Sequence, residues 1–418
     1  MSDRAADRTP SASGEVAIGL LGRGTVGGAF AELIAARADE VAAASGRRPE
    51  IAGVLRRSEG DFDEILAGSE IVVELMGGLE PAREHVLRAL EAKRHVVTAN
   101  KQLIAQHGDE LFAAAREAGV QLRFEAAVAG VVPVIRVIQE SLAGSEITRV
   151  LGIVNGTTNF ILTEMASTGA AYADALARAQ EVGYAEADPT EDVNGTDAAA
   201  KMAILARLAF GSPVNLGDVS YEGIEEIQPD DIAYAKELGL SLKLLGVAER
   251  RGEGISVRVF PCFLHRGHPL APVEGPFNAV TVEAPAIREI TMSGPGAGGP
   301  QTASAVLGDV VSAMIPPAST PETTQRLEIA DDVVSAFYLH LEVADRPGVL
   351  AQVAQVLGLQ GASIKSVVQK GLGDQARLTM VVHPLLESRF FAAVRLIGQL
   401  DFMRSPPRAI RVIDEEFV

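Results

Sequence analysis

Asp197 and Lys201 stand four residues apart in a segment, 195–210, that we expect to be helical. Side chains at positions i and i+4 of a helix share one face, so this carboxylate and this ammonium group should lie side by side. Such a pair is most often a surface ion pair. In a binding site the same ammonium group can donate a proton and stabilise negative charge that develops on a substrate oxygen. Both interpretations stay open on this spacing alone.

The run GRGTVG (22–27) is a second candidate for chemistry, because it follows an apolar run and opens a helical pattern. In a dinucleotide-binding turn, Gly22 permits the tight bend, Gly24 lets the backbone approach a pyrophosphate, and Gly27 permits close packing. A lone G-x-G-x-x-G is a weak signal and can be a structural turn. Its position after the first strand of a βαβ pattern favours nucleotide binding.

Arg56 and Arg57 follow the second apolar run, 50–55. An NAD-binding fold usually offers Asp or Glu there to the ribose hydroxyls, whereas arginine suits the 2′-phosphate of NADP. The alternative is a pair of solvated surface arginines. The first interpretation predicts that NADP(H) is preferred and that NAD(H) can also serve.

Cys262, with His265 and His268 close by, suggests a different chemistry. Aldehyde dehydrogenases that form a thiohemiacetal need a cysteine nucleophile and a basic partner. Cys262 lies within the alternating run 255–264, however, which favours a buried structural cysteine without an activating cation. As the single cysteine of the chain it excludes an intrachain disulfide and fits a reducing compartment.

The elements that must position these residues change along the chain. From Val16 to about residue 145, helical patterns separate five short apolar runs, at 16–22, 50–55, 70–75, 94–99 and 121–126. Strands that are buried on both faces and separated by helices indicate an α/β, doubly wound parallel sheet. Lys101 then falls at the end of a strand over 95–101, at the carboxyl edge where such sheets bind ligands.

After about Gly144 the pattern indicates an α+β domain with a broad antiparallel sheet. Helical segments are expected around 157–182, 195–210 and 230–248, and alternating strands at 255–264, 277–284 and 286–293. A helical run follows GPGAGG (294–299) and is expected to return to the first domain. The Pro-, Ser- and Thr-rich run 316–325 is the predicted linker.

The last segment has a pattern of its own. Residues 337–343 alternate as a half-buried strand, Pro347 suits a first helical residue, and Gly361 suits a helix end. Strands over 363–369 and 376–384, a helix over 388–400 and a strand from 409 complete a ferredoxin-like βαββαβ unit.

Length and composition limit the class of protein. A chain of 418 residues that is 47% hydrophobic should form two or three domains. Its net charge of −18 argues against a nucleic-acid partner. No apolar run approaches the roughly 20 residues that span a bilayer, and the polar N-terminus lacks the apolar core of a signal peptide. We expect a cytoplasmic protein with no membrane partner.

Five further runs carry a family resemblance: VELMGG (73–78), VVTANKQLIA (96–105), EAAVAGVVPVI (125–135), GIVNGTTNFIL (152–162) and GYAEADPTEDVNGTDAAAK (183–201). From Val16 to Asp309 the sequence resembles the homoserine dehydrogenases, with these motifs in the family's order and spacing. The segment with ADRPGVLAQVA (344–354) resembles an ACT domain, which this family often carries. The resemblance implies reversible reduction of L-aspartate 4-semialdehyde to L-homoserine with NAD(P)H, in threonine, methionine and isoleucine biosynthesis.

The resemblance also implies roles for individual residues. It makes Lys201 the proton donor and Asp197 a carboxylate of the substrate site. It gives the substrate's ammonium group to Glu186, with Asp192 nearby and Gly183 supplying a backbone contact. Lys101 should contact both cofactor and substrate. The cofactor contacts that it implies are Gly22, Gly24, Thr25, Val26, Gly27, Arg56, Thr98 (close to the nicotinamide), Lys101 and Gly298.

A monovalent cation site is implied at Glu125, Val128, Gly130 and Val132, where Na⁺ would meet mostly backbone carbonyls. The sequence departs from the family here, since it has GVVP (130–133) where a G-G-I-P-like run is usual. Backbone ligands survive such side-chain changes. The alternative is a plain strand-to-helix turn.

The expected organisation is a disordered leader, a Rossmann-type domain joined by a returning helix (300–315), a catalytic and dimerisation domain, a linker and an ACT domain, over 1–14, 15–145, 146–315, 316–334 and 335–418. We expect a homodimer or homotetramer, feedback regulation with threonine as the leading effector, and a chain ending near Asp331 that keeps catalysis. Two alternatives are a thiol-dependent semialdehyde dehydrogenase and a non-catalytic nucleotide and amino-acid sensor. The sensor is disfavoured because Lys101, Glu186, Asp197 and Lys201 are all present.

Overall fold

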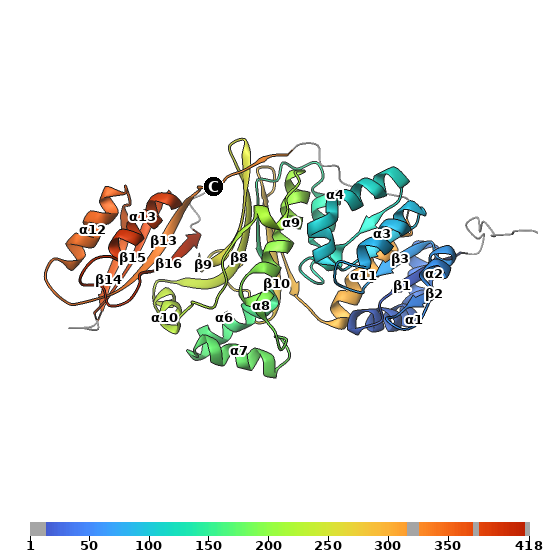
Figure 1. Cartoon of the computed structure of the whole chain (residues 1–418), viewed down its shortest axis with the longest axis horizontal. Coiled ribbons are helices and arrows are strands. Elements are labelled where there is room, and N and C mark those ends of the chain that lie inside the picture. The colour runs from blue at the N-terminus through green and yellow to red at the C-terminus, as the bar shows by residue number, and fades with distance from the viewer. Residues whose placement is uncertain (1–13, 316–325, 371–375, 414–418) are drawn as a thin grey trace, which may run out of the picture. The chain divides into compact units, whose positions relative to one another are not determined.

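The computed structural model describes residues 14–315, 326–370 and 376–413, so the expected leader lies outside the described residues apart from Gly14. The chain divides into two compact units (Figure 1). The first is Met1–Glu146, Ala203–Leu216 and Met292–Arg326, and the second is Ile147–Met202, Gly217–Thr291 and Leu327–Val418. The segment 146–315, expected to be one domain, is therefore shared between them. Within the described residues no helix has the length and apolar character to cross a membrane.

The first unit contains a parallel sheet of five strands, in the order β2-β1-β3-β4-β5. The strands are β1 (Glu15–Leu21), β2 (Arg48–Leu55), β3 (Ile71–Glu74), β4 (His95–Thr98) and β5 (Leu122–Arg123). The predicted doubly wound α/β sheet is confirmed, and β3 is buried along its whole length, as its apolar run indicates. The fifth strand is shorter than expected, because the chain turns at Glu125 into a 3-10 helix, Glu125–Ala127.

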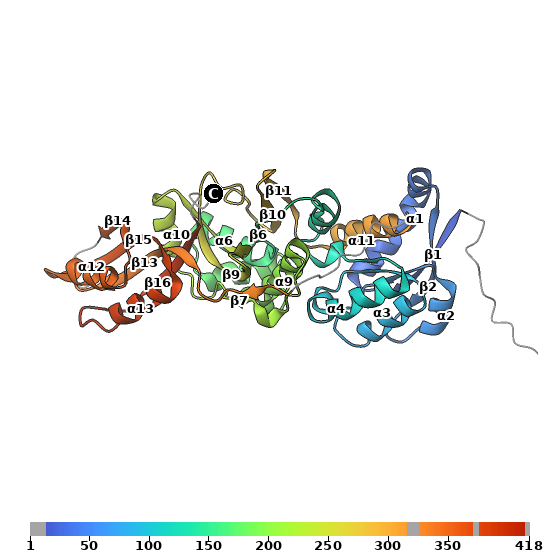
Figure 2. The same cartoon turned by 90° about the horizontal axis from the view of Figure 1, so that it is seen from above.

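Helices cover both faces of this sheet. Figure 2 shows α1 and α11 on one face and α3 and α4 on the other. The helices are α1 (Thr25–Ser45), α2 (Phe62–Gly68), α3 (Ala82–Glu91), α4 (Lys101–Ala118), α5 (Val134–Arg136, continued by a π-helical turn, Val137–Ser141) and α11 (Gly299–Ala313). Ala303, Val306 and Val310 of α11 join Phe30 of α1 in one apolar core. The helix that follows GPGAGG thus packs on the first sheet although it lies far along the chain.

The second unit has a mainly antiparallel sheet flanked by helices. Its first strands are β6 (Arg149–Ile153), β8 (Leu240–Arg251), β9 (Gly254–His265), β10 (Phe277–Ala284) and β11 (Arg288–Pro295), with short strands β7 (Ser220–Tyr221) and β12 (Glu328–Ile329) beside β9. Its helices are α6 (Gly156–Thr168), α7 (Tyr172–Glu181), α8 (Thr190–Val193) and α10 (Pro229–Glu237). Helix α9 (Thr196–Phe210) begins in this unit and continues into the first unit from Ala203, and a 3-10 turn follows at Leu216–Asp218.

Two predictions for this region were wrong. The helix expected over 230–248 ends at Glu237, and β8 takes over after Gly239, whose φ of 75° breaks the helix. Most of β8 is buried on both faces, and such a continuous apolar run cannot be told from a helix by periodicity. The linker expected over 316–334 is not all linker, because β12 pairs with β9; residues 316–325 lie outside the described residues.

The C-terminal module, residues 334–413, has the predicted βαββαβ order. Its elements are β13 (Val334–Val343), α12 (Val349–Leu359), β14 (Ile364–Lys370), β15 (Ala376–Leu386), α13 (Glu387–Ile397) and β16 (Arg408–Ile413). Phe337, Leu339 and Leu341 of β13 enter a core with α12 and α13, which confirms the predicted alternation. Helix α12 begins two residues later than Pro347, because Gly348 takes a left-handed φ of 90°.

The C-terminal module shares a sheet with the rest of the second unit. Strand β16 pairs in parallel with β9, so one sheet runs in the order β11-β10-β6-β8-β9-β16-β13-β15-β14. This pairing conflicts with the expectation that a chain ending near Asp331 keeps catalysis. Such a chain would expose the edge of β9 and would leave Arg258, which is buried, without Glu387.

Candidate active site

Asn155 lies at the centre of a polar cluster in the second unit. It stands between β6 and α6 as the N-cap of that helix, where its Oδ1 accepts a hydrogen bond from the Thr158 amide at 2.8 Å. Its Nδ2 donates to Asp192 Oδ1 at 2.7 Å and to Asp197 Oδ2 at 2.8 Å. One capping side chain thereby fixes two carboxylates, and Asn155 itself is only 4% exposed.

Lys201 completes this cluster from the first turns of α9. Its Nζ donates to Asp197 Oδ2 at 2.7 Å and to the carbonyl oxygen of Val154 at 2.8 Å. The side chain of Lys201 is 15% exposed and that of Asp197 is 3% exposed. The pair is therefore not the solvated surface ion pair of the alternative interpretation. We call Asn155, Asp192, Asp197 and Lys201 the substrate constellation.

Asp192 is a carboxylate of this constellation whose pKa is raised. Burial raises its pKa, the nearby charge of Asp197 raises it further, and the hydrogen bond from Asn155 opposes both. Glu186 and Gly183 lie outside the cluster, on the exposed loop between α7 and α8. Gly183 has a left-handed φ of 80°, and the backbone oxygen of Glu186 accepts from Gln180 Nε2 at 3.1 Å.

In the first unit, the nucleotide turn (residues 22–27) joins β1 to α1. Gly22 has a φ of 95°, and a Cβ there would lie 2.6 Å from the Leu75 carbonyl oxygen at the end of β3. A Cβ on Gly27 would lie 2.1 Å from the Gly22 carbonyl oxygen, whereas a Cβ on Gly24 would meet open space. Two glycines are thus required by packing, and the third leaves room for a ligand against the backbone.

The N-termini of two helices meet beside this turn. Helix α1 begins at Thr25, followed by Val26, and α11 is capped by Gly298 at a φ of 136°. A Cβ on Gly299 would lie 3.1 Å from Thr25 Cγ2, so the GPGAGG turn and the nucleotide turn are neighbours. Two helix N-termini with backbone amides and positive partial charge favour an anionic group such as a pyrophosphate.

A second polar cluster lies at the carboxyl ends of β3 and β4. The Thr98 hydroxyl donates to Glu74 Oε2 at 2.6 Å, and Glu74 Oε1 accepts from the Met76 amide at 2.7 Å. Asn100 caps α4 by accepting from the Leu103 amide at 3.1 Å. Lys101 is therefore the first residue of α4 and not the last of a strand, since β4 ends at Thr98. Thr98 is fully buried.

Arg56 and Arg57 follow the end of β2, as predicted, and both are exposed. Arg56 Nη1 lies 3.0 Å from Glu59 Oε2, and the backbones of Arg56 and Glu59 form a bridge. The guanidinium expected to meet a 2′-phosphate thus already has an acidic neighbour, which the sequence reasoning did not anticipate.

Glu125 is buried and acts as a helix cap in the first unit. Its two carboxylate oxygens accept from the amides of Ile135 and Arg136, both at 2.8 Å. Burial raises the pKa of Glu125 to about 7, with the charge of Asp309 adding to the effect. In the following turn Gly130 has a φ of 66°, which a side chain could not share because a Cβ would lie 2.4 Å from the Gly296 carbonyl oxygen. Val128 and Val132 flank this turn.

Cys262 does not fit the thiol-dependent alternative. It is fully buried in β9, and burial raises the pKa of its thiol. Burial lowers the pKa of His268 to about 4, and its Nδ1 accepts a hydrogen bond from the Leu270 amide at 3.1 Å. Cys262 is therefore a core residue.

Sequence reasoning missed three residues that organise these clusters: Asn155, Glu74 and Asn100. Each lay inside a run that the resemblance used. Asn155 and Asn100 follow strands and precede helices, which is the N-cap position that asparagine favours, so capping could have found them. Glu74 carried a weaker signal, an acidic residue at the end of a buried apolar run.

Comparison with known proteins identifies three regions. Residues 22–125 match the homoserine dehydrogenase NAD-binding domain, residues 133–311 match homoserine dehydrogenase, and residues 337–402 match the ACT domain. The chain is 40% identical to homoserine dehydrogenase of Neisseria gonorrhoeae, over 95% of this chain and 98% of that protein. It is 45% identical to homoserine dehydrogenase of Corynebacterium glutamicum, over 95% of each.

A crystal structure of a homoserine dehydrogenase from Thiobacillus denitrificans is also similar. It superposes with a TM-score of 0.91 at 39% identity, covering 96% of this chain and 98% of that one. The match thus spans the nucleotide-binding, catalytic and ACT regions together. The chain belongs to the homoserine dehydrogenase family, and its activity is the NAD(P)-dependent interconversion of L-aspartate 4-semialdehyde and L-homoserine.

Proposed function

We propose that Lys201 donates the proton to the alkoxide oxygen that forms when the aldehyde is reduced. The observation that carries this proposal is the anchoring of Nζ between Asp197 Oδ2 and the Val154 carbonyl oxygen. An ammonium group has three N–H donors, so two anchored hydrogen bonds orient the third toward a substrate oxygen. The nicotinamide supplies the hydride when bound. Asp197 balances the charge of Lys201, and Asn155 holds Asp197 in place.

We assign the amino-acid end of the substrate to the segment before α9. Asp192 is partly buried and held by Asn155, so its carboxylate is oriented for an ammonium group. Glu186 is the second carboxylate for that group, and its exposed loop lets it approach a ligand. Gly183 supplies backbone contact. The substrate would then extend from these acidic residues toward Asp197 and Lys201.

For the cofactor, we assign the pyrophosphate to Gly22, Gly24, Thr25, Val26 and Gly27 with Gly298, where open space and two helix N-termini fit an anion. Lys101, at the start of α4, is assigned to cofactor and substrate, and Thr98 to the nicotinamide side, where its buried hydroxyl is already used by Glu74. Arg56 favours NADP(H). A related hyperthermophilic archaeal homoserine dehydrogenase was solved in complex with NADPH, at 28% identity and a TM-score of 0.64.

A Na⁺ site is proposed at Glu125, Val128, Gly130 and Val132. Both oxygens of Glu125 already accept backbone amides, so backbone carbonyls of the left-handed turn at Gly130 would be the main ligands. This arrangement fits a monovalent cation, for which oxygen ligands without high charge suffice. Its contribution would be to hold the turn that contacts Gly296.

The C-terminal module is proposed to bind an amino-acid effector, with threonine as the leading candidate. Its α12 begins after Gly348, within the DRPGVL run (345–350), and the backbone amides of a helix's first turn suit a ligand carboxylate. Arg346 is paired with Asp401 at this turn. We further propose a homodimer or homotetramer and a cytoplasmic location, in line with a biosynthetic role.

A steady-state assay tests these assignments together. Oxidation of L-homoserine should reduce NADP⁺ with a lower Michaelis constant than NAD⁺. Added threonine should lower the rate, and replacing Na⁺ with a larger cation should change it. The absence of homoserine-dependent reduction of either cofactor would contradict the proposed site. Activity that ignores threonine would remove only the effector assignment.

A further inference from the structure

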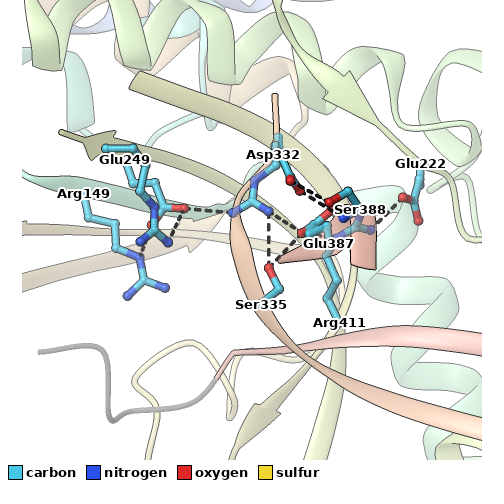
Figure 3. A network of polar contacts seen from close by, with 10 residues as sticks. Arg149, Glu222, Glu249, Asp332, Ser335, Glu387, Ser388 and Arg411 are labelled. Carbon is cyan, nitrogen blue, oxygen red and sulfur yellow. Dashed lines mark hydrogen bonds and ion pairs between the residues drawn. The ribbon is translucent and has the colours of Figure 1, made fainter. Parts of the chain in front are cut away.

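A buried charge network joins the C-terminal module to strands β8 and β9 of the second unit (Figure 3). Arg411 of β16 donates two hydrogen bonds to Glu387, from Nε to Oε1 at 3.0 Å and from Nη2 to Oε2 at 2.8 Å. Arg258 of β9 donates to Glu387 at 2.7 Å and to Glu249 of β8 at 2.8 Å. Although burial opposes its ionisation, the hydrogen bond and charge of Arg411 lower the pKa of Glu387.

One arm of the network leaves the core. Arg411 Nη1 donates to Glu222 Oε1 at 2.6 Å, and Glu222 is the labelled carboxylate at the far end of Figure 3. The Arg411 side chain is 9% exposed, whereas that of Glu222 is 52% exposed. Strand β9 and the C-terminal module are already joined through the contact of Arg258 with Glu387. The Glu222 arm is thus an additional, half-exposed contact beyond the buried pairs that join the module to β9.

The backbone of the segment that carries Glu222 is hydrogen-bonded both to β9 and to the residues before α9. Glu222 N donates to the Val259 carbonyl oxygen at 2.8 Å, and Ile224 N donates to that of Val193 at 2.9 Å. A Cβ on Gly223 would lie 2.3 Å from the Val193 oxygen, and one on Gly195 would lie 2.9 Å from the Glu222 oxygen. These contacts pack residues 222–224 closely against Val193 and Gly195. We call residues 189–195, which contain the short helix α8 and Asp192, the substrate loop.

We propose that Glu222 and Arg411 are positioning residues for homoserine binding: their ion pair ties the substrate loop to the C-terminal module. Arg411 fixes the Glu222 side chain, the backbone of 222–224 fixes Val193 and Gly195, and these residues set the place of Asp192. The inference rests on the proposed role of Asp192 in binding the substrate ammonium group. It makes the substrate site, and not the nucleotide turn, dependent on the seating of β16.

The variant Glu222→Gln is the direct test, because it removes the charge from a half-exposed side chain and leaves the buried Arg411–Glu387 pair intact. Asp230→Asn is its matched control. Asp230 of α10 lies 2.8 Å from Arg377 of β15, so it also joins the C-terminal module to the catalytic part, at similar exposure, but away from the substrate loop. Both full-length variants are compared in Michaelis constants for homoserine and NADP⁺ and in melting temperature.

Glu222→Gln is expected to raise the Michaelis constant for homoserine about threefold to tenfold, a usual range for a residue that acts through its neighbours. The constant for NADP⁺ should stay within about twofold, and the melting temperature should match that of Asp230→Asn. Glu222→Asp keeps the charge and should restore most of the homoserine affinity.

Equal homoserine constants for Glu222→Gln and Asp230→Asn would overturn the inference, as would equal shifts for homoserine and NADP⁺. Asp192→Asn in the same assay separates the two levels of the argument. If Asp192→Asn weakens homoserine binding and Glu222→Gln does not, the positioning role alone fails. If Asp192→Asn has no effect, the proposed substrate site fails first.

Discussion

The substrate constellation and the nucleotide turn are held together by different interactions. In the second unit, side chains hold side chains: Asn155 orients Asp192 and Asp197, and Asp197 orients Lys201. In the first unit, the turn at 22–27 depends on glycines, because Gly22 and Gly27 have no space for a Cβ and Gly24 leaves space for a ligand. One region is governed by charge and hydrogen bonding, and the other by backbone shape.

This difference predicts two kinds of sensitivity. Substitutions in the constellation should change rate and homoserine binding through protonation and charge, with little effect on folding of the first unit. Substitutions in the turn should change packing and cofactor affinity, with little dependence on pH.

The largest effect is expected from Lys201→Met, which removes the proton and charge but keeps similar length. General acid catalysis supplies about 10²–10⁴-fold in rate, so kcat should fall within that range. Binding of NADP⁺, measured by calorimetry, should change little because Lys201 belongs to the charge-built region. A folded variant that turns over within about threefold of the wild type would shift the proton-donor role to Lys101 or to a bound water.

The next effect is steric and belongs to the nucleotide turn. Gly27→Ala would place a Cβ 2.1 Å from the Gly22 carbonyl oxygen, so backbone must move. Overpacking of this kind costs about 1–3 kcal/mol, and the free energy of unfolding and the NADP⁺ affinity should both fall. Gly28→Ala is the matched control, since its Cβ meets nothing within 4 Å and alanine favours a helix. Equal behaviour of the two variants would refute a packing role for Gly27.

The same contrast explains which features the sequence could predict. The glycine turn, the parallel sheet and the βαββαβ order follow local rules, and the Asp197–Lys201 pair needs only helical spacing. The sharing of one sheet by β9 and β16 depends on residues about 150 positions apart (Arg411 beside Cys262), and no local pattern encodes that contact. The Glu59 partner of Arg56 was missed because an ion pair depends on the turn between them.

The pH dependence of homoserine binding tests the substrate constellation without a substitution. Because burial and Asp197 raise the pKa of Asp192, this carboxyl takes up its proton at a higher pH than an ordinary aspartate does. Protonation removes the charge that binds the substrate ammonium group. The Michaelis constant for homoserine should therefore rise as pH falls, and it should begin to rise above the usual range for aspartate. Asp192→Asn should raise the Michaelis constant for homoserine and make it depend less on pH. If the variant has the same pH dependence as the wild type, Asp192 is not the group that causes it.

The smallest effect is expected from substitution of Arg56, which lies at the edge of the nucleotide-binding region. Arg56 would add a charged side chain to a site that is otherwise formed by backbone. A desolvated contact to a 2′-phosphate would contribute about 1.5–3 kcal/mol, but Arg56 is exposed and paired with Glu59 at 3.0 Å. Exposed pairs contribute about 0–1 kcal/mol, so Arg56→Ala should raise the Michaelis constant for NADPH only about twofold to fivefold and leave that for NADH unchanged. Glu59→Gln releases the guanidinium from its carboxylate and should lower the NADPH constant by a similar factor. Added salt should reduce both differences, because screening acts on exposed charges. If Arg56→Ala affects NADPH and NADH equally, the arginine does not read the phosphate, and cofactor preference must come from backbone shape alone.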